Sequence, residues 1–128
     1  MRILLDTATF LWAVSDDPEF SDEAREIFVD PANEIYLSSV SAWEIAVKNA
    51  LGKLPLPEPP GRFVPLQRKQ HGIDPLQLDE EAALYLSRLP LLHKDPFDRM
   101  LVCQAIVHHL AILTPDELIQ QYSVQTFW

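Results

Sequence analysis

The sequence predicts an α/β fold in which helices cover both faces of a parallel β-sheet. Short apolar runs alternate along the chain with longer amphipathic runs, a pattern typical of strands joined by right-handed crossover helices. The length of 128 residues suits a single domain. A hydrophobic content of 48%, a charged content of 23% and the lack of any apolar run near 20 residues exclude disordered, collagen-like and membrane-spanning chains.

The first strand is expected at Arg2–Leu5, which is too short and too apolar for a surface helix. A helix follows at Thr9–Val14, and the segment 16–18, Asp-Asp-Pro, stops it. A second helix is expected at Ser21–Val29, because Ser-Asp-Glu at its start suits a helix N-terminus.

The next strand and helix are expected on either side of residue 40. Ile35–Leu37 is rich in β-forming residues and predicts a second strand. Ser41–Leu51 is helical in pattern and is followed by Gly52, a residue type common just after a helix C-terminus. Four prolines between positions 55 and 60 then predict a loop, because no helix can continue through them.

The third strand is the weakest expectation, at Leu76–Leu78. A helix is expected before it at Arg62–Gln70, and another after it at Asp79–Leu89, with Asp79 as N-cap. The segment Pro90–Pro96 is expected to be a loop.

The last quarter of the chain is expected to hold a long buried helix and two strands. Phe97–His109 is almost wholly apolar, so this helix is expected to be buried on more than one side. A fourth strand at Leu110–Leu113, a short helix at Pro115–Gln121 and a last strand at Ser123–Phe127 complete the pattern.

Acidic residues follow the strands or begin the helices that come after them. Asp6 ends the first strand, Glu44 follows the second, and Asp116 lies just beyond the fourth. Asp95 and Asp98 begin the long apolar helix. Because the carboxyl ends of parallel strands meet at one edge of a sheet, we expect these five carboxylates to converge there.

Helix capping is the alternative explanation for most of these acids. Residues 41–44, Ser-Ala-Trp-Glu, form a capping-box pattern, and residues 95–98 and 114–117 have the form of an N-cap followed by proline and an acid. Capping does not explain Asp6, and Asp98 shares its helical face with apolar residues, so its side chain is expected to point inward.

Carboxylates that gather at one partly buried edge repel one another and raise each other's pKa. A divalent cation removes this penalty. Oxygen donors without a cluster of histidine or cysteine suit Mg²⁺ or Mn²⁺ better than zinc. Such sites orient and activate water for the cleavage of phosphodiester bonds.

Four motifs, in this order, resemble the PIN-domain family and, more narrowly, the VapC-like toxins of bacterial type II toxin–antitoxin systems. Each motif alone is weak, but the ordered set is specific and runs from Arg2 to about Tyr122. The motifs are Leu4-Leu5-Asp6-Thr7, Ser39-Val40-Ser41-Ala42-Trp43-Glu44-Ile45, His93-Lys94-Asp95-Pro96-Phe97-Asp98-Arg99-Met100-Leu101 and Leu113-Thr114-Pro115-Asp116.

The resemblance implies one PIN domain over residues 1–128, built as a three-layer α/β/α sandwich. Its five-stranded parallel sheet would have the strand order 3-2-1-4-5. The implied activity is that of an endoribonuclease that depends on one or two Mg²⁺ or Mn²⁺ ions and hydrolyses RNA with metal-activated water. The implied partners are an RNA substrate, a cognate antitoxin protein and a second copy of the chain.

The resemblance also assigns residues to roles. Thr7 and Thr114 match supporting polar positions, and Asp95 belongs to the Asp-Pro-Phe-Asp-Arg signature, where we favour a role as helix cap. Ala8 stands where close relatives often have histidine, a departure that would weaken activity if that histidine orients the substrate or a ligand. The catalytic and metal-binding carboxylates implied by the family's acidic quartet are Asp6, Glu44, Asp98 and Asp116.

Three cations near these acids are candidates for contacts with RNA phosphates: Lys48, Lys94 and Arg99. Lys48 also has the spacing for a surface ion pair with Glu44, and for Arg99 an ion pair with Asp95 is the favoured interpretation. The net charge of −9 does not exclude RNA, since five of the nineteen acids belong to the cluster expected at the site.

The alternative function is that of a catalytically inactive, PIN-like module whose acids only cap helices and which binds a protein partner. Two enzyme-like classes with acidic α/β sites fit less well, since a dehalogenase-like phosphatase needs an acid at Ala8 and a receiver domain needs a lysine after a late strand. The single cysteine, Cys103, and an acid at position 6, too early for a signal peptide, predict a reducing cytoplasm and no membrane association.

Overall fold

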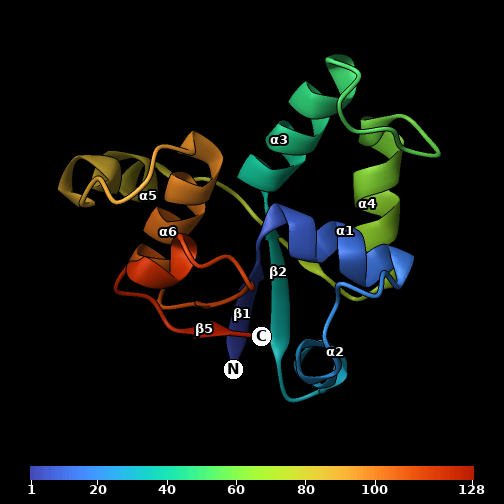
Figure 1. Cartoon of the computed structure of the whole chain (residues 1–128), viewed down its shortest axis with the longest axis horizontal. Helices are drawn as coiled ribbons and strands as arrows, with labels where there is room; N and C mark the ends of the chain where they lie inside the picture. The colour runs from blue at the N-terminus through green and yellow to red at the C-terminus, as the bar shows by residue number, and fades with distance from the viewer.

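Five parallel strands form one sheet at the centre of the computed structural model, which describes residues 1–128. Their order is β3-β2-β1-β4-β5, which confirms the predicted topology (Figure 1). In the register, Ile3 of the central strand pairs with Ile35 on one side and with Ala111 on the other. The strands are β1 Arg2–Leu5, β2 Glu34–Ser38, β3 Asp74–Leu76, β4 Ala111–Leu113 and β5 Thr126–Phe127.

Helices cover both faces of the sheet, which gives the expected three-layer α/β/α arrangement. In Figure 1, α5 and α6 lie on one side of the strands, α1, α2 and α4 lie on the other, and α3 extends beyond the end of β2. None of the helices is long and apolar enough to span a membrane. The α-helices are α1 Thr7–Ser15, α2 Asp22–Val29, α3 Ser39–Ala50, α4 Pro60–Gln70, α5 Glu80–Tyr85 and α6 Pro96–His108, and 3₁₀ turns lie at Leu86–Arg88 and Ile119–Gln121.

The central strand β1 has side chains in both cores of the protein. Ile3 and Leu5 belong to the core beneath α1, α2 and α4, whereas Leu4 belongs to the core beneath α6. All three side chains are fully buried. Burial of each contributes roughly 1.5–3 kcal/mol, which explains why a run as short as Arg2–Leu5 forms a strand. The carboxyl end of this strand therefore holds the next residue, Asp6, at the junction of both cores.

Several predicted helix ends are confirmed. The side chains of Ser21 and Asp79 accept hydrogen bonds from backbone N–H groups three residues later and cap α2 and α5. Asp95 caps α6 in the same way, and Pro96 occupies the first helical position. Gly52 follows the end of α3 with a φ of +72°, a conformation that glycine adopts without steric cost.

The start of α3 differs from the prediction. The helix begins at Ser39 rather than at Ser41, and its N-cap is Ser38, whose hydroxyl oxygen accepts from the backbone N–H of Val40. Ser38 also contacts the side chain of Gln104 on α6, 2.5 Å away. This contact across the fold favours Ser38 over the local capping-box pattern, so the predicted box at residues 41–44 is wrong.

The third and fifth strands and the segment after β4 also differ from the prediction. β3 lies two residues earlier than expected, at Asp74–Leu76, and pairs only with β2. Its Pro75 is tolerated because an edge strand does not need every backbone N–H for pairing. The helix expected at Pro115–Gln121 does not form, and a turn leads into the 3₁₀ turn Ile119–Gln121 instead. β5 consists of Thr126–Phe127 alone.

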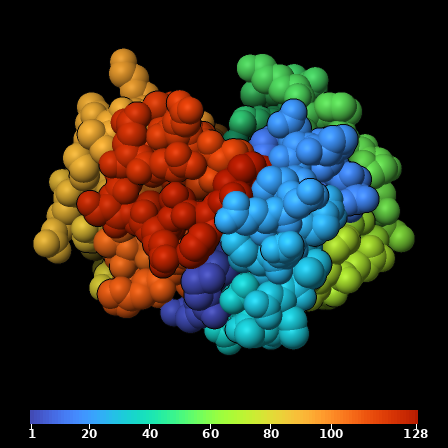
Figure 2. All heavy atoms as spheres, turned by 60° about the horizontal axis from the view of Figure 1, so that its bottom comes forward, coloured from blue at the N-terminus to red at the C-terminus, as the bar shows by residue number.

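The C-terminus packs against α1 and the segment that follows it. The indole of Trp128 lies 5.8 Å from that of Trp12 and 6.0 Å from the ring of Phe20, measured between centroids. Figure 2 shows this contact from outside, with the red C-terminal segment against the blue segment that holds α1. These aromatic contacts hold the short edge strand β5 in place beside β4.

Candidate active site

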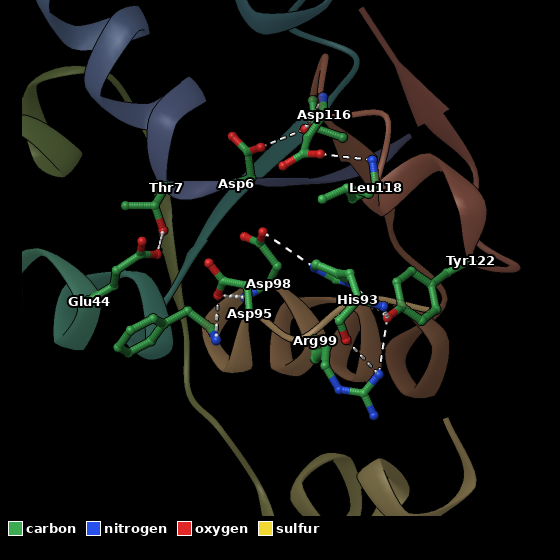
Figure 3. Close-up of polar contacts among 12 residues, drawn as sticks. Asp6, Thr7, Glu44, His93, Asp95, Asp98, Arg99, Asp116, Leu118 and Tyr122 are labelled. Atoms are coloured by element: carbon green, nitrogen blue, oxygen red, sulfur yellow. Dashed lines mark hydrogen bonds and ion pairs between the residues drawn. The ribbon is translucent and has the colours of Figure 1, made fainter. Parts of the chain in front are cut away.

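The acids predicted to converge do meet at the carboxyl edge of the sheet. Asp6 follows β1, Asp116 follows β4, Asp95 and Asp98 begin α6, and Glu44 projects from α3 (Figure 3). Burial and, after it, the negative charges of the other four acids together raise the pKa of Asp98 to about 7. Five carboxylates from four separate segments therefore act on one another electrostatically.

Asp6 has two hydrogen-bond partners although it is 95% buried. One carboxylate oxygen, Oδ1, accepts from the backbone N–H of Thr9 at 2.8 Å, so Asp6 is the N-cap of α1. The other, Oδ2, accepts from the hydroxyl of Thr114 at 2.5 Å. The expectation that capping does not involve Asp6 is thus wrong, and α1 begins two residues earlier than predicted. Burial still raises the pKa of Asp6 above its usual value, despite these hydrogen bonds.

Glu44 is not a helix cap, contrary to the capping-box interpretation. It lies in the second turn of α3 and is 5% exposed. The hydroxyl of Thr7 donates to Oε1 of Glu44 at 2.6 Å, and the same hydroxyl lies 2.9 Å from Oγ of Ser41. The remaining oxygen, Oε2, forms an ion pair with Lys48, one turn later on the helix. Interaction with the helix dipole therefore does not account for this buried acid.

Asp95 and Asp98 lie at the start of the same helix but in different environments. Oδ1 of Asp95 accepts from the backbone N–H groups of Phe97 and Asp98, at 2.9 and 3.0 Å, which confirms the interpretation of Asp95 as a cap. The side chain of Asp98 is 19% exposed, and its Oδ2 lies 3.5 Å from Nε2 of His93. Asp98 thus faces the other acids rather than its own helix.

Asp116 is held in a turn rather than at a helix start. Its backbone N–H donates to the hydroxyl oxygen of Thr114 at 3.0 Å, and its Oδ1 accepts from the backbone N–H of Leu118 at 2.8 Å. Thr114 is fully buried and bonds to both Asp6 and Asp116. A single hydroxyl therefore connects the acid after β1 with the acid after β4.

Arg99 does not have either of the roles expected for it. It is 9% exposed, and its guanidinium donates to the carbonyl of Pro90 at 2.9 Å and to the hydroxyl of Tyr122 at 3.1 Å. The ion pair with Asp95 is not formed, and the guanidinium is not available to RNA. Lys94 is exposed. The hydrogen bond to Glu44 raises the pKa of Lys48, and the negative charges of Glu44, Asp95 and Asp98 act in the same direction.

Two residues beside the acids are not identified as site residues by the sequence analysis. The side chain of His93 is only 6% exposed, and its Nδ1 lies 2.7 Å from the hydroxyl of Tyr122 (Figure 3). His93 is part of the third motif, which is the only local signal for it. Tyr122 comes 29 residues later, and no local pattern links the two.

The donors at this edge are carboxylate oxygens, the type of ligand that a hard divalent cation prefers. The pKa values of the Asp6 and Asp98 carboxyl groups are raised, so their ionised forms are unfavourable without a cation. Neutralising their mutual repulsion would favour binding. In the conformation described, however, no three acidic, histidine or cysteine side chains lie close enough together to hold an ion. Glu44 in particular is engaged by Thr7 and Lys48. Metal binding would therefore require rotations of the acidic side chains, while the backbone that carries them is already in place.

Comparisons with known proteins agree with this fold. Residues 3–124 match the family model of the PIN domain. The chain is 48% identical over 58 residues to a protein named Ribonuclease VapC16 from Mycobacterium tuberculosis; the match covers 45% of this chain and 41% of that protein, less than half of its length.

Two solved structures share the fold at low sequence identity. One is VapBC2 from Rickettsia felis bound to a DNA fragment from its promoter, with a TM-score of 0.73, 13% identity, and coverage of 99% of this chain and 98% of the other. The other is DNA-bound VapBC from Salmonella typhimurium, with a TM-score of 0.71, 16% identity, and coverage of 99% and 97%. Because the family model spans almost the whole sheet and all the acids at its edge, this chain belongs to the PIN domain family.

Proposed function

We propose that this protein acts as one PIN domain over residues 1–128 and is a metal-dependent endoribonuclease, the toxin of a toxin–antitoxin pair. The observation that carries the proposal is the gathering of carboxylates from four segments at one partly buried edge, where burial first and then their mutual repulsion raise the pKa of Asp98 to about 7. Acids that destabilise one another when ionised are retained where a cation compensates them. Membership of the PIN domain family and the relative named Ribonuclease VapC16 support the same activity.

The residues that would hold the metal are Asp6, Glu44, Asp98 and Asp116. Mg²⁺ or Mn²⁺, as one or two ions, supplies charge neutralisation and the activation of water for phosphodiester hydrolysis when bound there. Thr114 and the N-terminus of α1 orient Asp6, and Thr7 orients Glu44. In the reaction, the oxygen of water bonds to phosphorus and the bond from phosphorus to the 3′-oxygen breaks. The products are a 3′-hydroxyl, which takes up a proton, and a 5′-phosphate.

Two lysines remain as candidates for contacts with the RNA backbone. Lys48 lies in the field of three of the acids, and Lys94 is exposed directly before the cap of α6. With ten Lys and Arg against nineteen Asp and Glu, RNA binding should be modest and strongly dependent on metal. A cytoplasmic location is part of this proposal, because the substrate is RNA.

A cognate antitoxin and a second copy of the chain are the proposed protein partners. The antitoxin is supported by the structural neighbours, which are described as VapBC complexes from Rickettsia felis and Salmonella typhimurium. The test is co-expression of the chain with the product of its neighbouring gene. Formation of a stable complex and relief of growth inhibition are expected, and a neighbouring product that does neither would contradict this part of the proposal.

The activity is tested with Asp6→Asn and Asp98→Asn. Both variants should fold, judged by circular dichroism, and should lose RNA cleavage and growth inhibition. The matched control is Glu117→Gln, which removes an exposed acid from the same edge and should leave cleavage unchanged. Retained cleavage in the folded Asp6 and Asp98 variants would contradict the assignment. A folded parent protein that neither cleaves RNA nor binds Mn²⁺ at millimolar concentration would instead favour the protein-binding module.

A further inference from the structure

One buried nitrogen beside the acids has no hydrogen-bond partner. Nε2 of His93 is buried and unpaired, and the carboxylate oxygen Oδ2 of Asp98 lies 3.5 Å from it. The side chain of His93 is 94% buried. Leaving a buried polar group unpaired costs roughly 1–3 kcal/mol. The orientation of this ring therefore has to be maintained by interactions on its other side.

Those interactions come from Tyr122. The phenolic oxygen of Tyr122 accepts from a guanidinium N–H of Arg99 at 3.1 Å and from the backbone N–H of His93 at 3.3 Å. Both of these N–H groups are donors and cannot accept a hydrogen bond, so the Tyr122 hydroxyl can donate its own hydrogen to another group. Its neighbour is Nδ1 of His93, 2.7 Å away. In the neutral imidazole, Nδ1 is then the acceptor, and the ring proton lies on Nε2 and is directed at Asp98.

The anchor is rigid. Tyr122 is 4% exposed and Arg99 is 9% exposed, and Arg99 also donates to the carbonyl of Pro90 at 2.9 Å. The rings of His93 and Tyr122 pack edge to face, with centroids 5.4 Å apart. The imidazole is therefore held on its Nδ1 side, and only its Nε2–H remains to interact with the carboxylate of Asp98.

We propose that His93 is a positioning residue that orients the carboxylate of Asp98 for metal binding through its Nε2–H group. This inference rests on the proposed function, because it assigns to Asp98 the role of a metal ligand. A hydrogen bond to a carboxylate spans about 2.7–3.2 Å, so a small rotation of Asp98 from its 3.5 Å separation forms it. Removing a group that hydrogen-bonds to a metal ligand and orients it typically lowers metal affinity by roughly 10–100-fold.

The experiment compares His93→Asn with His93→Gln. The amide of asparagine can bond to Tyr122 but is too short to reach Asp98, whereas the longer glutamine places an N–H group near the position of Nε2. We measure the dissociation constant of Mn²⁺ by titration calorimetry and the free energy of unfolding by urea titration. His93→Asn should weaken Mn²⁺ binding about 10-fold or more, and His93→Gln should stay within about threefold of the parent protein.

Two results would overturn the inference. One is that His93→Asn binds Mn²⁺ as tightly as the parent protein. The other is that both variants lose affinity equally and in proportion to their loss of stability, which is the signature of a purely structural role. If the parent protein itself binds no Mn²⁺, the proposed function fails, and this outcome is distinct from the first two.

A second measurement needs no metal. In protein labelled with ¹⁵N-histidine, long-range ¹H–¹⁵N correlation spectra distinguish the two neutral tautomers, and the signals of His93 are those lost in His93→Asn. The expected tautomer carries its proton on Nε2 and should become a mixture in Tyr122→Phe. A ring protonated on Nδ1 in the parent protein would contradict the proposed orientation.

Discussion

The hydroxyl of Thr114 donates a 2.5 Å hydrogen bond to Oδ2 of Asp6, across 108 residues of sequence. The two residues follow β4 and β1, which are neighbours in the parallel sheet. The same hydroxyl oxygen accepts from the backbone N–H of Asp116. One buried side chain therefore sets the positions of two of the acids proposed to bind metal.

Replacing Thr114 tests this arrangement. Thr114→Val keeps the shape of the side chain but leaves a buried carboxylate oxygen of Asp6 without its donor, so the free energy of unfolding should fall by about 1–3 kcal/mol. Mn²⁺ binding should weaken in parallel, as measured by calorimetry. Thr114→Ser retains the hydroxyl and is the matched control. A Thr114→Val variant with the stability and Mn²⁺ affinity of the parent protein would contradict a role for the hydrogen bond.

The raised pKa of Asp98 predicts how the stability of the metal-free protein depends on pH. Its folded-state pKa is about 7, against an ordinary value of 3.8, so the folded protein holds a proton that the unfolded chain has already lost between these pH values. Stability should therefore fall as the pH rises from about 4 to about 7 and should then level off. The direction is opposite to that of a carboxylate stabilised by an ion pair.

Asp98→Asn should remove this dependence. In urea titrations, the stability difference between the variant and the parent protein should be near zero at pH 4 and should rise to about 2 kcal/mol in favour of the variant at pH 8, allowing for screening of a side chain that is 19% exposed. Excess Mn²⁺ at pH 8 should stabilise the parent and not the variant. A difference that stays constant with pH would contradict the raised pKa.

Asp95 should behave as a cap and not as a metal ligand. Asp95→Ala removes the acceptor for two backbone N–H groups of α6 and should lower the free energy of unfolding by about 1 kcal/mol. Asp95→Ser keeps a cap acceptor without the charge and should restore most of that stability. Mn²⁺ affinity in the serine variant should change by no more than about fivefold, the size of a surface charge effect. A larger loss, with stability intact, would make Asp95 a metal ligand.

Arg99 and Lys94 form a matched pair for separating stability from RNA binding. Arg99→Met leaves the carbonyl of Pro90 and the hydroxyl of Tyr122 without a buried donor, so we expect a loss of about 3 kcal/mol in the free energy of unfolding. Lys94→Met alters an exposed cation and should leave stability within about 0.5 kcal/mol. RNA binding in low salt should decrease for Lys94→Met. Unchanged stability of Arg99→Met would show that its buried hydrogen bonds contribute little.

Local sequence patterns predict most of the fold because their causes lie within a few residues. The apolar runs at β1, β2 and β4 predict buried strands, and the caps Asp79 and Asp95 lie directly before the N–H groups that they satisfy. The placement of acids after strands predicts their convergence, since parallel strands end at one edge. The strand order, by contrast, comes from the family resemblance rather than from any local pattern.

The tertiary structure alone decides which of several plausible local partners each residue takes. Ser38 rather than Ser41 caps α3 because Gln104 of α6 meets Ser38, and Glu44 thereby moves from a cap position to a buried contact with Thr7. The same holds for Arg99, whose nearby acid Asp95 is satisfied by backbone N–H groups while its own partners lie elsewhere.

The sequence by itself thus determined the strands β1, β2 and β4, the caps of α2, α5 and α6, and the set of acids at one edge. Only the assembled sheet decided the hydrogen bonds from Thr114 to Asp6 and from Tyr122 to His93, which span 108 and 29 residues. The physical reason is that propensity and capping act within one turn of chain. A buried polar group, in contrast, must be satisfied by whichever partner the packed elements bring within about 3 Å.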